Sequence, residues 1–542
     1  MTDKTADLIL FGGKIYTLDA AGTTATAIAV SKGKILAVGS DDQIEKLAGP
    51  GARRIHLAGA IVLPGLIDSH IHISSVGQVS EMAFLYDAWS ISDIMDRLKD
   101  HAQKTRGAVV GRGGNFHESS LAEGRLPTAA DLDSVATDRP VMITDVNKTI
   151  VNSLVLRSID PDDIPPGGEA PKDASGKPLG IFLYAAKMMT PLGGPAASVS
   201  NISTEEAIVR GLREAARLGH TGVLDAIVNL ESIAAYRAIE REQGLPIRAS
   251  IMPRLRSATP GELKRIGPLT VTVVDLERIG ASAGLQEGRL TFGPIKLGFD
   301  RWIMHRTALM YEPYMGQANN FGSTGVPEEE LQRQIDEAFG AGWPVGIHTT
   351  GDRGVDIVAS AVEKGIEKAG GPPGRCHLIH VYFPTDEALD IAGRHGLAIA
   401  AQPTFIRTWG ETVRAFVGQE RAERFTPLRT MLDRGLAVGG GADSPITWHN
   451  PWVGIYAAAT RKTEGGRILG EKERITVEEA LRCYTLGSAA ILEQEEIRGS
   501  IEVGKMADFT VIDRDILTID PEQIPATKVL KTIVGGEVAY EA

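Results

Sequence analysis

Residues 61–72 read Ile-Val-Leu-Pro-Gly-Leu-Ile-Asp-Ser-His-Ile-His, and this stretch decides how the rest of the chain is interpreted. Its first seven positions are almost entirely apolar, which is typical of a strand buried on both faces of a parallel sheet. His70 and His72 are two positions apart, so a strand directs both imidazole rings to the same side. Two imidazoles at this spacing suit Zn²⁺ or a similar divalent ion. Taken alone, the motif is weak evidence for a metal, and two polar side chains at a strand end are the more common explanation.

Apolar, strand-like segments of the same kind recur along the rest of the chain, and most are followed by a helical pattern. Together with residues 61–70 they make eight, the others being 221–225, 247–252, 292–297, 344–348, 376–380, 397–402 and 436–443. Eight buried strands separated by helices predict the α/β class and, within it, a (β/α)8 TIM barrel. Residues 204–218 and 328–340 predict amphipathic helices with capping residues at their starts.

Both ends of the chain contain short strands separated by turns. Near the N-terminus, residues 8–11 and 14–17 suggest a hairpin around two glycines. Neither end has enough strands for an independent sheet. We therefore expect residues 1–60 and 485–542 to form one composite β-sandwich.

The predicted barrel occupies residues 61–484. About 150 residues separate its first two strands, which is far more than a loop and one helix require. We therefore expect residues 75–203 to form a subdomain inserted after the first strand, over one end of the barrel.

Composition excludes several classes of partner. The formal net charge of −12 at pH 7 argues against a surface for nucleic acid or anionic membranes. Two cysteines are too few for a disulfide framework, and Cys376 lies in an apolar run that predicts a buried thiol. The first residues lack a signal-peptide pattern, and no stretch reaches the ~18 apolar residues that span a bilayer. We expect a cytoplasmic protein that acts on a small molecule.

Chemically reactive side chains collect at the ends of the predicted strands, which face the active site in a barrel of this kind. These residues are His70, His72, Lys296, His348, His380 and Asp443. Four of the twelve histidines of the chain therefore fall on strand ends, which favours a metal site over scattered structural histidines. Asp443 follows a glycine-rich turn, and beside a metal-bound water it is a natural general base. A carboxylate that only caps a turn is the alternative for Asp443.

Lys296 is the unexpected member of this group. An ammonium group beside metal cations is repelled, so an ordinary lysine is unfavourable there. Three interpretations stay open from the residues alone: a substrate contact, a side chain that extends to the surface, and a lysine carboxylated by CO₂ to an anionic carbamate.

The order and setting of these motifs resemble the amidohydrolase superfamily. The matching segments are 65–72, Lys296 with Asp300, 348–353, His380, 402–405 and 442–445. The chain is similar to the branch that contains N-substituted formamide deformylase, at residues 113–132, 151–153 and 306–314. Segment 499–508 is similar to the superfamily's return to its β-sandwich.

The resemblance implies a centre of two divalent ions, Zn²⁺ by default, although Mn²⁺, Fe²⁺ or Ni²⁺ also suit the ligands. It implies that His70 and His72 hold one ion with Asp443, that His348 and His380 hold the other, and that carboxylated Lys296 bridges them. It also implies that a hydroxide shared by the metals attacks the carbonyl carbon while Asp443 passes a proton to the leaving amine. A homodimer is a further expectation from the family.

Several residues near the expected mouth are candidate substrate contacts. They are Asn115, Phe116, His117, Asn147, Arg301, His305 and Gln402. Asn147 and Arg301 differ from the residues that relatives often carry, so the substrate itself is not transferred from the resemblance.

The predicted function is hydrolysis of a C–N bond in an amide, an N-substituted formamide, a carbamate or a cyclic amide (class EC 3.5). Ester or lactone hydrolysis stays open, because the same centre activates either carbonyl. A decarboxylase or isomerase on the same metal site is a second alternative. A scaffold protein without activity is a third, and the retention of every ligand position counts against it.

Overall fold

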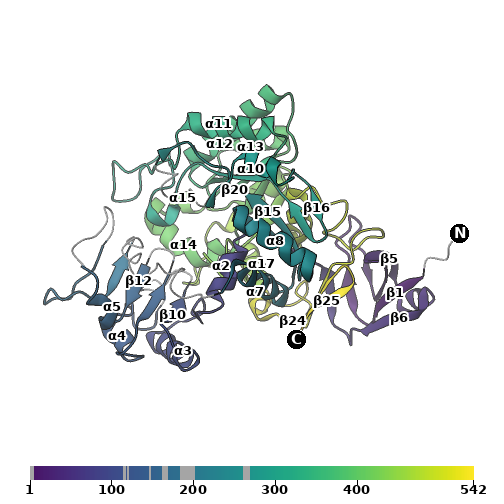
Figure 1. Cartoon of the computed structure of the whole chain (residues 1–542), viewed down its shortest axis with the longest axis horizontal. Helices are drawn as coiled ribbons and strands as arrows, with labels where there is room; N and C mark the ends of the chain where they lie inside the picture. Colours follow the sequence, from purple (N-terminus) through teal and green to yellow (C-terminus); the bar gives the residue numbers. More distant parts are fainter. Residues whose placement is uncertain are drawn as a thin grey trace.

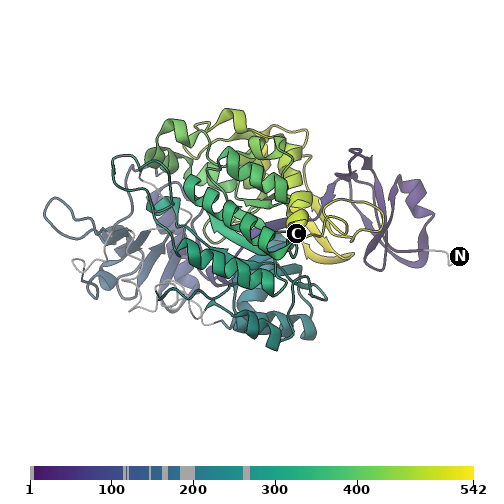
Figure 2. The same ribbon diagram turned by 90° about the horizontal axis from the view of Figure 1, so that it is seen from above.

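The computed structural model describes residues 5–113, 118, 121–145, 148–160, 169–183, 202–260 and 269–542. Three regions follow one another along the longest axis of the molecule (Figures 1 and 2). A sheet within residues 83–183 lies at one end, sheets built from both termini lie at the other, and the predicted barrel strands lie between them. Among the described residues, no helix is long and apolar enough to cross a membrane.

The two ends of the chain meet in two neighbouring sheets. The first has the order β5 (Lys34–Gly39), β4 (Ala27–Ser31), β1 (Ala6–Phe11) and β6 (Ala48–His56). The second has the order β25 (Glu537–Glu541), β24 (Val529–Val534), β23 (Phe509–Ile512), β7 (Ile61–Pro64), β2 (Lys14–Tyr16) and β3 (Thr24–Ala25). Leu10 and Val30 of the first sheet share one buried cluster with Phe509 and Ile533 of the second. Apolar burial therefore joins segments from opposite ends of the chain.

The prediction of a hairpin from residues 8–11 and 14–17 is wrong. β1 pairs with β4 and β6, whereas β2 pairs with β3 and β7 in the other sheet. Gly12 has a φ of +72°, and the chain passes from one sheet to the other at this point. A local Gly-Gly signal thus marks a crossing between sheets, which short-range patterns do not distinguish from a hairpin turn.

The segment between the first two predicted barrel strands forms a sheet of its own. Its order is β13 (Ile181–Leu183), β12 (Lys148–Val151), β11 (Val141–Thr144), β10 (Val109–Arg112) and β9 (Ala83–Phe84). The accompanying helices are α3 (Ile91–Lys104), α4 (Ala129–Asp133) and α5 (Ser153–Leu156). Leu98 of α3 and Leu132 of α4 pack on Val109 and Ile143 of the sheet in a separate buried cluster.

The predicted barrel strands are present, with two of them divided. The first parallel group has the order β16 (Gln286–Glu287), β17 (Leu290–Phe292), β15 (Arg248–Pro253), β14 (His220–Val228) and β8 (Leu66–Ile71). In this group only β16 is antiparallel to its neighbour. The second parallel group has the order β18 (Ile295–Gly298), β19 (Val345–Thr349), β20 (His377–His380), β21 (Ala398–Ala401) and β22 (Val438–Gly440). The described ladders thus form two sheets and do not close into one continuous barrel.

The two divisions have local causes. Residues 61–70 divide at Gly65, where an added Cβ would lie 2.1 Å from Oγ1 of Thr221. The part before Gly65 joins the terminal sheet as β7, and the part after it joins β14 as β8. Residues 292–297 divide at Gly293-Pro294, and proline has no N–H to continue a ladder.

The two parallel sheets nevertheless meet at both sides. Arg254 and Lys296 form an isolated parallel bridge between the end of β15 and β18. On the other side, the N–H of Asp443 donates to the carbonyl of His70 at 2.8 Å, and the N–H of His72 donates to that of Ser444 at 2.9 Å. The carboxyl ends of the strands, which carry the predicted site residues, are thereby brought together.

Helices cover the outer faces of these sheets. Those between parallel strands are α7 (Thr204–Arg217), α8 (Leu230–Glu242), α10 (Val273–Arg278), α11 (Glu328–Gly340), α12 (Asp352–Ala369), α13 (Asp386–His395), α14 (Thr404–Val417), α15 (Gln419–Ala422) and α16 (Leu428–Asp433). The rest are α1 (Asp41–Glu45), α2 (Ile73–Val79), α17 (Pro451–Thr460), α18 (Val477–Arg482) and α19 (Ser488–Ile491). The two helices predicted from 204–218 and 328–340 are confirmed as α7 and α11, and Ser203 caps α7 by accepting from the N–H of Glu206.

Candidate metal centre

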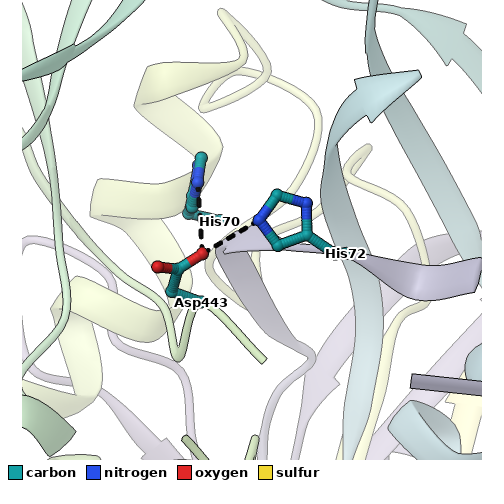
Figure 3. A group of neighbouring side chains, drawn as sticks. All are labelled: His70, His72 and Asp443. Atoms are coloured by element: carbon teal, nitrogen blue, oxygen red, sulfur yellow. Dashed lines mark hydrogen bonds and ion pairs between the residues drawn. The ribbon is translucent and has the colours of Figure 1, made fainter. Parts of the chain in front are cut away.

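His70, His72 and Asp443 meet at the carboxyl ends of β8 and β22 (Figure 3). Oδ1 of Asp443 lies 3.0 Å from Nε2 of His72 and 3.5 Å from Nε2 of His70. Asp443 adopts a left-handed backbone with a φ of +52°, which L-residues adopt rarely. The two hydrogen bonds that join β8 to residues 443–444 hold this turn against the histidines.

The donor set of these three residues fits a divalent cation. Their ligand atoms all lie within 4.8 Å of one another, and two neutral imidazoles with one carboxylate are typical ligands of Zn²⁺. Burial, followed by the nearby Lys296, holds the pKa of His70 well below its usual value, so its ring is neutral and keeps a lone pair for a ligand. Burial is the largest influence on His72 and lowers its pKa, but the hydrogen bond to Asp443 and the negative charges of Asp443 and Asp225 together outweigh it and raise the pKa.

The other predicted ligands lie beside this group. The ring of His380 is 5.3 Å from that of His70 and 4.5 Å from that of His348, between ring centroids. Nζ of Lys296 lies 3.3 Å from Nε2 of His70. All six predicted ligands line one pocket of about 450 Å³. The structure therefore brings together side chains that come from five different strand ends.

Lys296 is buried in the wall of this pocket. It is 2% exposed, and burial, together with the positive charge of Arg254, holds the pKa of its amine well below the usual value. The interpretation that Lys296 extends to the surface is therefore wrong. A neutral amine is the form that reacts with CO₂, so the surroundings of Lys296 are compatible with a carbamate.

Two histidines of the group are oriented by contacts on the side away from the pocket. Nδ1 of His72 lies 3.0 Å from the carbonyl oxygen of Ala226. Nδ1 of His380 lies 2.7 Å from Oε1 of Gln402, whose Nε2 donates to the carbonyl of Ala400 at 3.0 Å. Such partners fix the tautomer of a ligand histidine and direct its other nitrogen towards the metal.

Gln402 was predicted as a substrate contact, and the structure places it elsewhere. It is fully buried behind His380, does not line the pocket, and its amide is occupied by the two contacts just described. Its position at the end of β21 was correct, but the side chain turns away from the opening. We therefore assign Gln402 to holding His380.

The remaining substrate candidates divide between the pocket rim and the part of the chain outside the described residues. Arg301 and His305 line the pocket with Trp302, and the rings of Trp302 and His305 stack with centroids 5.7 Å apart. The other candidates, Asn115, Phe116, His117 and Asn147, lie outside the described residues.

Three charged groups around the centre have no role in the prediction from sequence: Asp68 and Asp300 enter it only as part of matching motifs, and Arg254 is not named. Asp68 accepts from the N–H of His70 at 2.9 Å and from that of Ala442 at 3.2 Å, so it fastens both halves of the centre. Asp300 accepts from the N–H groups of Leu309, Thr350 and Gly351. Arg254 lines the pocket beside Lys296. Asp68 lies two residues before His70, and Asp300 lies four residues after Lys296. This closeness in sequence to predicted ligands is the feature that could have indicated their roles.

Cys376, in contrast, does not line the pocket that holds the predicted ligands. The thiol is buried, and burial raises its pKa to about 12. The prediction of a buried, unreactive cysteine is confirmed, because a nucleophilic cysteine requires an accessible thiolate.

A comparison with known proteins now identifies the family. A model of the Amidohydrolase family matches residues 53–540. The chain belongs to the amidohydrolase family. This amidohydrolase is 30% identical to YtcJ of Bacillus subtilis (strain 168) over 98% of the chain and 99% of that protein. It is 27% identical to the N-substituted formamide deformylase of Arthrobacter pascens, over 99% of the chain and 98% of that enzyme. The resemblance inferred from the motifs is confirmed.

A solved structure agrees with this assignment. The crystal structure of an uncharacterized metal-dependent hydrolase from Pyrococcus horikoshii OT3 superposes with a TM-score of 0.72 and 25% identity, over 95% of this amidohydrolase and 99% of that chain. The similarity therefore extends over nearly the whole chain.

Proposed function

We propose that this amidohydrolase uses bound metal to cleave a C–N bond in an amide, an N-substituted formamide, a carbamate or a cyclic amide. The observation that carries the proposal is the convergence of His70, His72 and Asp443 within 4.8 Å on one wall of a pocket large enough for a small substrate. The similarity to N-substituted formamide deformylase along 99% of the chain supports a C–N bond as the bond that breaks.

We propose two divalent ions, both Zn²⁺, of which the group of His70, His72 and Asp443 fits the first. His70, His72 and Asp443 would hold one ion, His348 and His380 would hold the other, and carboxylated Lys296 would be the ligand common to both. Such ions supply Lewis acidity at a carbonyl oxygen and lower the pKa of water. Burial of the Lys296 amine supports the carbamate, because it favours the uncharged form.

The protein's own groups have separate tasks in this proposal. As a water molecule attacks the carbonyl carbon, the carboxylate of Asp443 accepts one proton from it and returns that proton to the departing nitrogen. The backbone hydrogen bonds from Asp443 to His70 and from His72 to Ser444 hold the turn that carries this carboxylate. Trp302 and His305 line the wall of the pocket where they can hold the substrate body, with Arg301 beside them.

The domain organisation, the substrate class, the oligomeric state and the location remain proposals. We propose that the two parallel sheets act as one (β/α)8 barrel over residues 61–484, carrying 75–203 as an inserted subdomain. Residues 1–60 and 485–542 would form the β-sandwich domain. The small-molecule substrate, the homodimer and the cytoplasmic location also stay predictions.

The test is a substrate screen with Zn²⁺-loaded enzyme and its Asp443→Asn variant. N-formyl amines, N-acyl amines, carbamates, cyclic amides, esters and lactones are supplied, and release of amine or acid is measured. The proposal expects turnover of at least one nitrogen-containing class by the wild type and its loss in the variant. Turnover of esters or lactones alone would contradict the C–N assignment, and equal turnover by the variant would contradict the role of Asp443.

A further inference from the structure

The turn that carries Asp443 is held by two parts of the molecule. The first part is β8, which exchanges backbone hydrogen bonds with residues 443 and 444. Within the turn, the N–H of Ile446 donates to the carbonyl of Asp443 at 2.9 Å. Because Asp443 has a φ of +52°, its backbone keeps this conformation only where surrounding contacts enforce it. The contacts that the second part makes with the turn therefore help to orient the carboxylate.

The second part is the inserted sheet, which contacts the carbonyl oxygen of Pro445. This oxygen accepts from the hydroxyl of Tyr86 at 2.7 Å, and from Nη2 and Nε of Arg112 at 3.0 and 3.3 Å. Tyr86 follows β9, and Arg112 is the last residue of β10. Neither side chain lines the pocket of the metal centre. Any effect that they have on the centre therefore passes through the backbone of the turn, two residues beyond Asp443.

The edge of the inserted sheet holds Arg112 in place for this contact. β9, β10 and β11 are parallel, so their carboxyl ends lie at the same edge. At that edge the N–H of Leu85 donates to the carbonyl of Arg112 at 2.9 Å. Nη1 of Arg112 lies 3.5 Å from the carbonyl oxygen of Asp145, the residue after β11. Because a guanidinium presents its donors in a rigid fork, Arg112 joins this edge to the turn that follows β22.

We infer that Arg112, with Tyr86, is a positioning residue for Asp443. The inference rests on the proposed function, because it concerns how the same carboxylate is directed at the two histidines. The hold on the carbonyl of Pro445 adds a third attachment to the two that β8 provides, and it keeps the turn in its left-handed conformation. Docking of the inserted sheet is thereby coupled to the geometry of the metal centre. The alternative is a contact that only fastens the inserted sheet to the rest of the protein.

Hydrogen exchange of the metal-free, full-length protein tests the hold on the turn. Arg112→Met is compared with the wild type and with Arg139→Met. Arg139 lies in the same inserted segment and donates to the carbonyls of Ala102 and Thr105 at 2.6 Å each, so its loss weakens the segment without touching the turn. We expect peptides covering residues 442–447 to exchange roughly 3- to 10-fold faster in Arg112→Met only, as the loss of one or two hydrogen bonds predicts. Equal rates in Arg112→Met and the wild type, or the same acceleration in both variants, would overturn the inference.

Cobalt reports the geometry of the centre without a substrate. Loaded with Co²⁺, Arg112→Met should show a changed visible absorption spectrum and roughly 10-fold weaker affinity, whereas Arg139→Met should match the wild type. On a substrate found in the screen, kcat of Arg112→Met should fall while KM changes little, because the side chain does not line the pocket. A spectrum and an affinity equal to those of the wild type would overturn the positioning role.

The two experiments separate this inference from the proposed function. Wild-type protein that binds no Co²⁺ would contradict the proposed metal centre, and the exchange rates would then decide alone whether Arg112 holds the turn. If Arg112→Met does not fold, Tyr86→Phe, which removes another donor to the same carbonyl, is judged by the same criteria.

Discussion

Oδ1 of Asp443 lies 3.0 Å from Nε2 of His72, although 371 positions separate the two residues in the sequence. The contact exists because β8 and the turn after β22 exchange backbone hydrogen bonds in both directions. It places a carboxylate next to two imidazoles in a buried pocket, where charge interactions are stronger than in water.

Replacing Asp443 by Asn should abolish most of the activity without unfolding the protein. Asn keeps the size of the side chain but accepts no proton, so kcat should fall by about 10²- to 10⁴-fold. The matched control is Asp96→Asn, because the side chain of Asp96 is 70% exposed on α3. Steady-state kinetics on a substrate found in the screen, with circular dichroism of both variants, decides the matter. A variant that retains wild-type kcat removes Asp443 from proton transfer.

Gln402 should affect metal affinity more than substrate binding. Gln402→Met removes the acceptor for Nδ1 of His380 at nearly constant volume, so metal affinity should weaken by about 10- to 100-fold. Competition with a chromophoric chelator measures this change. Gln419→Met, at an exposed position of α15, is the control. A raised KM with unchanged metal affinity would instead restore the original assignment of Gln402 to the substrate.

The amine of Lys296 should be carboxylated to a carbamate in the active protein. Enzyme prepared in ¹³C-labelled bicarbonate should show a carbamate carbon resonance, and this signal should be missing in Lys296→Met. The variant should also bind less metal, because it loses the proposed shared ligand. A spectrum of the wild type without the resonance, in protein that holds its metal, would mean that the lysine acts as a plain amine.

Buried histidines outside the centre should make the protein sensitive to acid. Burial lowers the pKa of His220 to about 3, whereas histidine in an unfolded chain has a pKa of about 6.5. Between these values the unfolded chain binds the additional proton, so stability falls as the pH decreases from about 6.5 towards 3. One such group contributes a slope of up to about 1.4 kcal/mol per pH unit.

Urea unfolding of metal-free protein at several pH values measures this slope, since metal release also depends on pH. His220→Gln keeps a donor for the carbonyl of His449, which His220 contacts at 3.1 Å, but it does not titrate. The unfolding free energy of His220→Gln should therefore change less steeply with pH than that of the wild type, by the amount that corresponds to about one bound proton. His56→Gln, at an exposed position, serves as the control. An identical slope in His220→Gln and the wild type would contradict the prediction.

The sequence predicted the parts of the fold that depend on local patterns. Continuous apolar runs located the parallel strands, and capping residues located α7 and α11. Because parallel strands place their carboxyl ends on the same side, the residues at those ends could be grouped before any coordinates were known. That reasoning brought His348 and His380 to the same place as the His70 pair.

The contacts that were missed depend on side-chain direction or on distant packing. Gln402 occupies a strand end like the ligands, yet its side chain turns to His380 because Nδ1 requires an acceptor. The division at Gly65 depends on its close approach to Thr221, 156 positions later in the chain. The crossing at Gly12 resembles a hairpin turn within any short window. Patterns of adjacent residues do not show which way a strand-end side chain points or which distant segment packs against a glycine.

Metal content tests the central claim most directly. Wild-type protein and His72→Asn are loaded with Zn²⁺, desalted, and analysed by inductively coupled plasma mass spectrometry. The account predicts that the wild type retains at least one Zn²⁺ per chain and that His72→Asn, folded by circular dichroism, retains clearly less. Wild-type protein that retains none, or a variant that retains as much as the wild type, would contradict the assignment of His70, His72 and Asp443 as a metal centre.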